Sequence, residues 1–461
     1  MWAVLSENKI HKRAKSIHLD REPTPELIKK LIEYHEQKNL PRYQMLQDYY
    51  EGYNRILNRT KEDRTKPNNR LVSGYPSYIV DLMQGYFVGK PITYTSSDKE
   101  LMAEIQDIFN YNDEQDENSE LAKMCGIKGR AYEVVYIDED SRVRFNELDA
   151  DYVVMAYDTK INSEPNFAIV VNWGASIDGV ADTPLTATVY TKDSILTYVE
   201  GENGLVLIEE REHYFGQVPI IEFLNNDEGI GDFERAISLI DAYDKAQSDT
   251  ANDFEEFTDA FLCLVNLSGT EKEDIQKLKE DKVLLLDEQG QAEWLIKNIN
   301  DAAIENYKKR LNDDIHKFAK IPDILDERFM GNTSGESMKY KLLALDQVIA
   351  AKQRKFKRAL QKRLELICSY LQWKTNKVYD YRDIDIQFKV NKPINEKEAV
   401  EMAIQMMGIT SLSTALSKVP GVDDVEMELA KIEEEKRMYI DLDMLEDEEV
   451  EEGIEVNNGE V

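Results

Sequence analysis

The stretch that most constrains the fold lies between residues 336 and 373, where neither proline nor glycine interrupts the chain. These two residues commonly end helices, so their absence predicts one helix of unusual length. Ser334, just before the stretch, is a candidate N-terminal cap. Apolar residues recur at mostly three- and four-residue steps, which predicts one buried stripe. The stripe comprises Met338, Leu342, Leu345, Ile349, Phe356, Leu360, Leu364, Ile367 and Leu371.

The same stretch carries an unusual charge. Between Lys339 and Arg363 there are nine lysines and arginines and one acid, Asp346, in a chain whose formal net charge is −33. Such a local reversal of sign needs an explanation. Two interpretations remain open: the basic face packs on acidic neighbours, or it contacts a polyanion.

Composition excludes several classes of protein. The 461 residues are 42% apolar, which suffices for sizeable cores and for about two to four domains. Ninety acids against 57 bases argue against general nucleic-acid binding. There is no run of 18 apolar residues, so no transmembrane span is expected, and the N-terminus is basic and polar rather than signal-like. Cys125, Cys263 and Cys368 lack the spacing of a metal site and are expected to be reduced thiols.

Catalytic motifs are not evident. The segment from Gly85 to Pro91 superficially resembles a phosphate-binding loop, but it is one residue short and has proline where a hydroxyl should follow the lysine. The five histidines lack ligand spacing. We therefore expect no enzyme, no metal site and no cofactor.

The order of predicted elements indicates an α+β fold, mostly helical with an inserted antiparallel β region. Residues 1 to about 125 are expected to be helical, and residues 131–208 show the two-residue period of short strands. An acidic helix follows at 232–261, with nine acids and two bases. Three short strands and a small helix then precede a returning helix at 301–320, and the C-terminal part, 395–440, is helical again.

This order, together with several local sequences, resembles the portal proteins of tailed bacteriophages, of the kind found in siphophages of Gram-positive hosts. The resemblance extends from about Pro25 to Ile440. It rests on the ordered set rather than on a single motif. The segments that carry it are Asn69–Leu71, Gly85–Pro91, Val218–Asn226, Ile321–Asp323 and the turn Gly331–Gly335 before the basic helix.

The resemblance implies a ring, typically of twelve subunits, at one vertex of the capsid, assembled in the host bacterial cytoplasm and retained in the virion. Double-stranded DNA would pass through it without sequence specificity. Its partners would be the terminase large subunit, head-completion or adaptor proteins, and scaffolding and major capsid proteins, with no membrane. The implied parts are a wing (1–230 with the long helix and strand 336–394), a stem (231–260 and 301–322), a clip (261–300), a tunnel loop (323–335), a crown (395–440) and an acidic disordered tail (441–461).

Site residues follow by position from the same resemblance. DNA contacts are expected at the tunnel loop and helix start: Arg328, Asn332, Thr333, Ser334, Lys339 and Lys341. Acids that line the channel would repel DNA and keep it centred: Asp241, Asp244, Asp249, Asp253 and Glu256. Bases that meet a neighbour's acidic helix would form the subunit interface: Lys352, Lys355, Arg358 and Arg363. The alternative is a cytosolic helical scaffold or adaptor, which would form no closed ring.

Overall fold

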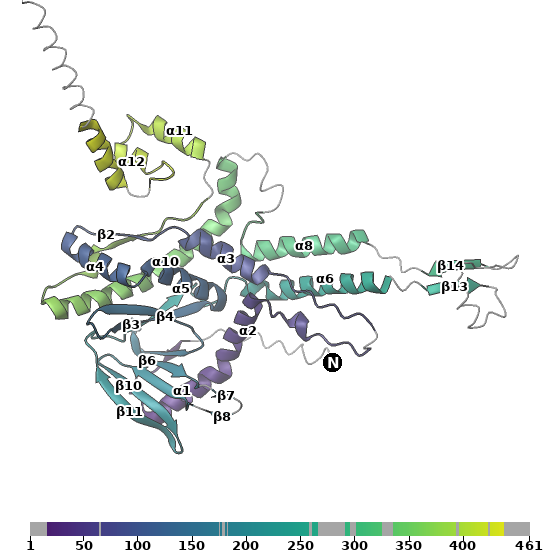
Figure 1. Ribbon diagram of the computed structural model, residues 1–461, viewed down its shortest axis with the longest axis horizontal. Coiled ribbons are helices and arrows are strands. Elements are labelled where there is room, and N and C mark those ends of the chain that lie inside the picture. The colour runs from purple at the N-terminus through teal and green to yellow at the C-terminus, as the bar shows by residue number, and fades with distance from the viewer. Residues whose placement is uncertain are drawn as a thin grey trace, which may run out of the picture. The chain divides into compact units, whose positions relative to one another are not determined.

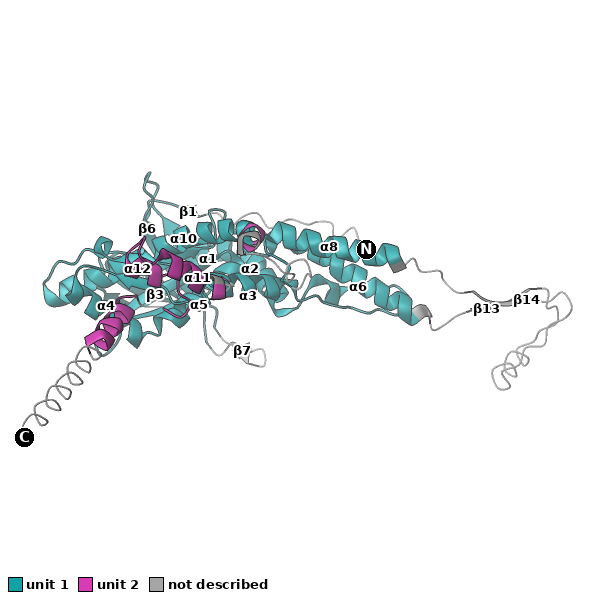
Figure 2. Ribbon diagram, turned by 90° about the horizontal axis from the view of Figure 1, so that it is seen from above, with its two compact units in different colours: residues 1–329, 342–391 teal, residues 330–341, 392–461 magenta. Residues whose placement is uncertain are grey.

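The computed structural model describes residues 16–63, 66–174, 176–177, 180–181, 183–257, 261–265, 291–295, 301–324, 335–392, 396–422 and 425–437. The chain divides into two compact units, one of residues 1–329 and 342–391 and one of residues 330–341 and 392–461 (Figure 2). Several predicted segments lie outside the described residues: the helix at 270–279, the strand at 282–287, most of the tunnel loop and the acidic tail.

The first unit begins with helices whose starts are locally encoded. The hydroxyl of Thr24 accepts a hydrogen bond from the backbone N–H of Leu27 (3.4 Å), and the carboxylate of Asp98 caps the fourth helix in the same way. The second helix ends at Glu51, because Gly52 adopts a left-handed φ of 88°. The helices are α1 (Pro25–Lys38), α2 (Leu40–Glu51), α3 (Tyr75–Val88), α4 (Lys99–Tyr111) and α5 (Glu114–Lys128).

A six-stranded sheet follows in the order β1-β5-β6-β9-β10-β11 (Figure 1). Its pairs are antiparallel, except that β1 runs parallel to β5. The two-residue period gives it two apolar faces, and Ile28 and Ile32 of α1 pack on the face that contains Val154 and Phe167. The strands are β1 (Ile17–His18), β5 (Val153–Tyr157), β6 (Pro165–Asn172), β9 (Thr186–Tyr190), β10 (Ser194–Gly201) and β11 (Gly204–Glu212).

The opposite face of this sheet packs on a smaller one. Val153 and Met155 of β5 contact a cluster that contains Tyr132 and Ile220. These two residues belong to a three-stranded antiparallel sheet in the order β12-β3-β4. Its strands are β3 (Arg130–Ile137), β4 (Val143–Leu148) and β12 (Ile220–Leu224). The predicted β region inserted among helices is therefore confirmed.

The predicted long helix is present as α10 (Gly335–Thr375). Its stripe is buried from Leu342 to Leu371, and Met338 is half-buried. The ring of Phe356 lies edge-on to Phe223 of β12 (centroids 4.8 Å apart) and to Phe87 of α3 (5.3 Å). The three-stranded sheet and α3 thus supply the surface that the stripe needs.

Two further helices, α6 (Ile237–Phe257) and α8 (Asp301–Ala319), pack side by side in the first unit (Figure 1). The predicted start of the acidic helix was early, because Glu234–Ala236 form a short 3-10 turn before α6. Between the two helices in sequence, β13 (Phe261–Val265) pairs antiparallel with β14 (Gln291–Leu295). Elsewhere β15 (Asp385–Gln387) pairs with β2 (Thr93–Thr95), and the short strands β7 (Ser176–Ile177) and β8 (Val180–Ala181) pair with each other.

The second unit is helical in its C-terminal part, as predicted. It contains α11 (Glu396–Met406), α12 (Leu412–Leu416) and a helix over residues 425–437. It also includes the first turns of α10, up to Lys341. Among the residues that the structure describes, no helix in either unit is long and apolar enough to cross a membrane.

Candidate functional site

The acidic helix α6 binds the loop between α2 and α3, residues 52–74, through a row of buried polar side chains. Asp244, Ser248 and Asn252 recur every fourth residue, which places them on one face of α6. They accept hydrogen bonds from the backbone N–H groups of Ser73 (2.8 Å), Leu71 (2.9 Å) and Asn69 (2.7 Å), respectively. We call these three pairs the polar ladder. It fastens the extended end of the loop to α6.

Arginines from the start of the same loop meet acids on α6. Arg59 Nη2 lies 2.5 Å from a carboxylate oxygen of Asp249, and Arg55 Nη1 lies 3.5 Å from one of Asp241. The hydroxyl of Tyr49 also donates to Asp241 (2.5 Å). These two arginines therefore offset part of the charge of α6 within one chain. The sequence identifies the acids of α6 but not their arginine partners.

The structure consequently corrects part of the predicted channel lining. The prediction that Asp244 lines the channel is wrong, because this residue is 1% exposed and also accepts a hydrogen bond from the side-chain amide of Asn54 (2.6 Å). Burial raises the pKa of Asp244, and also that of Asp241. Asp241 and Asp249 keep partial exposure but have partners in their own chain. Asp253 is half-buried, and the side chain of Glu256 lies outside the described residues.

Hydrogen bonds also connect α8 to its surroundings. Lys308 Nζ donates to the side-chain oxygen of Gln247 on α6 (3.2 Å). One turn further along α8, the Asn312 side chain accepts from the hydroxyl of Tyr75 (2.5 Å) and donates to Asp323 (3.1 Å). The first turn of α3 and the residue at which the predicted tunnel loop begins are therefore fastened to α8.

Several bases of α10 form ion pairs with acids of the same chain. Lys352 Nζ lies 2.5 Å from Asp232, and both side chains are less than a tenth exposed. The prediction of Lys352 and Arg363 as subunit-interface residues is wrong, because both are buried inside one chain. The first interpretation of the basic helix, packing on acidic neighbours, holds for these bases and their acids: Lys352 with Asp232, Lys355 with Asp227, Lys357 with Asp385, Lys362 with Glu164 and Glu365, and Arg363 with Glu133 and Glu114.

Arg363 forms the most enclosed of these contacts. Its side chain is fully buried and binds both oxygens of Glu133 on β3, with Nε 2.9 Å from one of them. Its Nη1 donates to Glu114 (3.3 Å) and Asn118 (2.9 Å) on α5. The guanidinium carbon lies 4.5 Å from the ring centre of Phe145. Sequence reasoning missed this role, although Arg363 falls seven residues after Phe356, in register with the apolar stripe.

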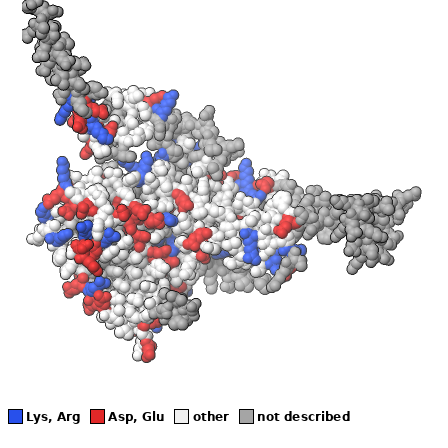
Figure 3. Space-filling view, viewed as in Figure 1, with Lys and Arg blue, Asp and Glu red and all other residues white. Residues whose placement is uncertain are grey.

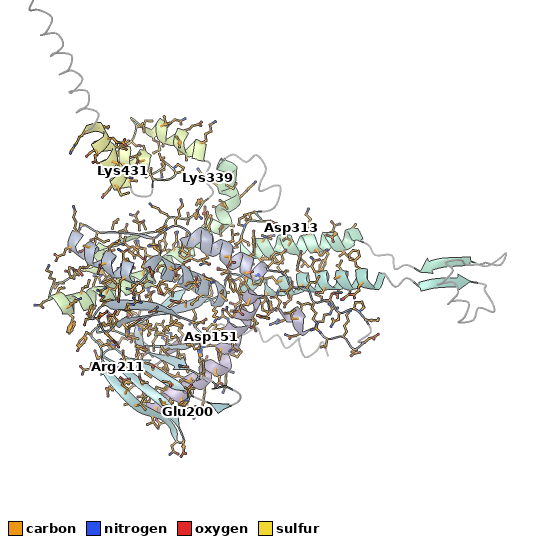
Figure 4. The ribbon with its side chains drawn as sticks, viewed as in Figure 1. Asp151, Glu200, Arg211, Asp313, Lys339 and Lys431 are labelled. Carbon is orange, nitrogen blue, oxygen red and sulfur yellow. The ribbon has the colours of Figure 1, made fainter. Side chains whose placement is uncertain are left out.

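The predicted DNA contacts lie at or near the start of α10. Lys339 is exposed on the first turns of α10 (Figure 4), and Lys341 is half-buried. Arg328, Asn332, Thr333 and Ser334 lie outside the described residues. Lys355 is partly exposed beside Asp227, and Arg358 is exposed. Acidic and basic side chains intermingle on the face seen in Figure 3, and no metal-binding cluster occurs among the residues that the structure describes.

A carboxyl pair beside the Arg363 cluster predicts a pH effect on stability. Glu117 accepts a hydrogen bond from the N–H of Glu147 (3.0 Å), and burial together with the Glu147 carboxyl raises its pKa from 4.5 to about 8. Since the folded state holds this proton more tightly than the unfolded state, the stabilisation is complete below about pH 4.5 and is lost as the pH rises to about 8. Glu117→Gln should flatten this part of the stability profile, measured by urea unfolding. The exposed control Glu104→Gln should keep the slope, and an unchanged slope in Glu117→Gln would contradict the assignment.

Two packed helices separated in sequence by a strand pair, an inserted β region and a long basic helix match the element order expected of a phage portal protein. The chain belongs to the family described as "Phage portal protein, SPP1 Gp6-like", whose model matches residues 29–442. The portal protein of Bacillus phage SPP1 is 27% identical over 93% of this chain and 90% of its own length. That of Clostridium phage phiCD119 is 23% identical over 84% of this chain and 91% of its own.

Among solved structures, the chain is similar to one from the neck of an empty GTA particle computed with C6 symmetry. The TM-score is 0.43 at 11% identity, over 76% of this chain and 90% of that one. The family assignment rests on the sequence comparisons. It confirms the resemblance predicted above and indicates a component of the phage capsid.

Proposed function

We propose that this protein forms a ring-shaped channel at one capsid vertex, through which double-stranded DNA is packaged and later ejected. The ring docks the terminase large subunit during packaging and head–tail connector proteins afterwards. The observation that carries the proposal is the packed pair α6 and α8, with β13 and β14 between them in sequence, in a chain of the portal family. In the proposed division, α6 and α8 are the stem and the strand pair belongs to the clip.

The balance of charge along α6 supports weak contact with DNA. A channel has to confine a polyanion without holding it, since each tight phosphate contact raises affinity and slows sliding. Arg55 and Arg59 already form ion pairs with Asp241 and Asp249 of α6. The negative charge of α6 that can repel DNA is therefore smaller than the sequence suggests. We therefore assign the weak DNA contacts to the start of α10, with Lys339 as the exposed candidate.

Negative-stain imaging combined with mass determination at moderate salt tests the proposal. We expect closed rings whose central hole admits duplex DNA, with a mass near twelve subunits. A monomer or dimer at all salt and protein concentrations would favour the alternative, a helical scaffold without a channel.

Charge reversal tests Lys355 and Arg358, the two predicted interface residues of α10 that are not buried within the chain. We expect the double variant Lys355→Glu and Arg358→Glu to reduce the yield of rings, because it replaces two bases on the solvent side of α10 with acids in an already acidic chain. Native mass spectrometry would measure the yield, with Lys99→Glu at the exposed start of α4 as control. Equal ring yields in both variants would remove this surface from the interface.

A further inference from the structure

Among the described residues of the C-terminal unit, more large apolar side chains are exposed than buried. Its described buried apolar side chains are Ala403, Ala415 and Leu416. Such a set is too small to hold a folded unit together on its own. The exposed apolar residues of the same unit, from α11 onwards, are Val400, Met402, Ile404, Met407, Ile409, Leu412 and Met427. So many exposed apolar side chains in one small unit are expected to mark an interaction surface.

The pattern on α11 shows how that surface is arranged. Ala403 is buried, and at about 100° per residue Met402 and Ile404 lie on opposite sides of it. Met402 is 50% exposed and Ile404 is 59% exposed. Val400 lies on the same side as Ile404, one turn before it, and Met407 directly follows the last residue of α11. The helix therefore has two exposed apolar flanks, with a buried strip between them.

Two different exposed flanks on one helix fit a cyclic assembly. In a closed ring each copy contacts its two neighbours through two different patches. A two-fold dimer would instead use one patch twice and leave the other flank in water. The flanks are also uncharged, so they allow contact between copies that each carry a formal charge of −33 without placing like charges opposite one another.

We propose that α11 packs between two neighbouring copies of this chain, with the Met402 flank of one copy facing the Ile404 flank of the next. The proposal rests on the ring proposed above and identifies one of its contact surfaces. The occupant of each flank is thus a second copy of the same unit. Assembly completes the apolar core that the isolated unit lacks.

Cross-linking distinguishes this arrangement from others. The variant carries Met402→Cys and Ile404→Cys together in a Cys263→Ser background, because Cys125 and Cys368 are buried. A short flexible bismaleimide added to the assembled protein should give a ladder of covalent oligomers that extends to the full ring. Either cysteine alone should leave monomers, since each contact joins two different flanks.

The polar side of the same helix supplies the control. Glu401→Cys with Gln405→Cys places two exposed thiols away from both flanks and should give no ladder. A ladder of equal strength in this control, or dimers from a single cysteine, would overturn the proposal. Imaging of each sample separates the two hypotheses: intact rings without a ladder refute the α11 contact alone, whereas absence of rings refutes the proposed function.

Substitution gives a second readout. Ile404→Gln removes apolar area from one flank at an exposed position, so the chain itself should still fold. We expect the association constant between copies to fall by about tenfold, as for the loss of one buried aliphatic contact. Gln405→Ala should leave it unchanged. Equal association in both variants, measured by mass photometry over a dilution series, would count against the contact.

Discussion

Replacing Arg363 with alanine is expected to lower the free energy of unfolding by about 3–5 kcal/mol, the usual cost of breaking a buried ion pair from one side. The variant leaves Glu133 fully buried and Glu114 nearly so, both without their cation. Burial already raises the pKa of Glu133, and the Arg363 guanidinium opposes that rise. Without the guanidinium the carboxyls must take up protons, so the loss should be larger at pH 8 than at pH 5.

Urea unfolding followed by circular dichroism measures this loss. The control is Arg354→Ala, which removes an exposed guanidinium from the same helix and should change stability by less than about 0.5 kcal/mol. A double variant, Arg363→Met with Glu133→Gln, removes one charge of each sign and should recover part of the loss. Equal stability of Arg363→Ala and Arg354→Ala would show that the cluster contributes little.

Replacing Asp244 with alanine is expected to cost about 2–4 kcal/mol, because the amide of Asn54 and the N–H of Ser73 both lose their acceptor in a buried position. The effect should be local, since the other two pairs of the polar ladder remain. Hydrogen exchange should rise at Leu71 and Ser73 while α10 keeps its protection. In Asp244→Asn the amide oxygen can still accept from Ser73, but the second carboxylate oxygen, which accepts from Asn54, is replaced by an amide nitrogen. The loss of stability should therefore lie between zero and that of Asp244→Ala.

Ser238→Ala is the matched control for Asp244→Ala, because Ser238 is exposed on the same helix. It should leave both unfolding and exchange unchanged. If Asp244→Ala accelerates exchange across the whole chain to the same degree, the ladder is part of the global core rather than a local fastening.

Periodic patterns predicted the fold well. The absence of proline and glycine between residues 336 and 373 gave α10, and the two-residue period gave the β region. These patterns depend on neighbours in sequence, so a single chain reveals them. The predicted boundary was wrong where a local turn decides it, as at the start of α6, which follows a 3-10 turn at Glu234–Ala236.

The candidate site was harder to predict, because its partners are far apart in sequence. Arg363 and Glu133 are separated by 230 positions, and Asn69 and Asn252 by 183. The sequence revealed a basic helix and an acidic helix, but not that Lys352 and Arg363 would pair with acids of the same chain, or that Arg55 and Arg59 would pair with acids of α6. Partner choice depends on the tertiary fold, and the parts named wing, clip and crown stay predictions.

The polar ladder also fixes its own length. Four residues of helix rise about 6.0 Å, whereas two residues of extended chain span about 6.6 Å, so successive pairs drift apart by about half an ångström. Three pairs absorb that drift within ordinary hydrogen-bond variation. Counting two residues back from Asn69 reaches Pro67, which has no N–H to give, and counting two forward from Ser73 reaches Tyr75, the first residue of α3. The four-residue repeat of the helix and the two-residue repeat of the extended chain therefore match only over these three pairs. Pro67 at one end and the start of α3 at the other prevent a fourth pair.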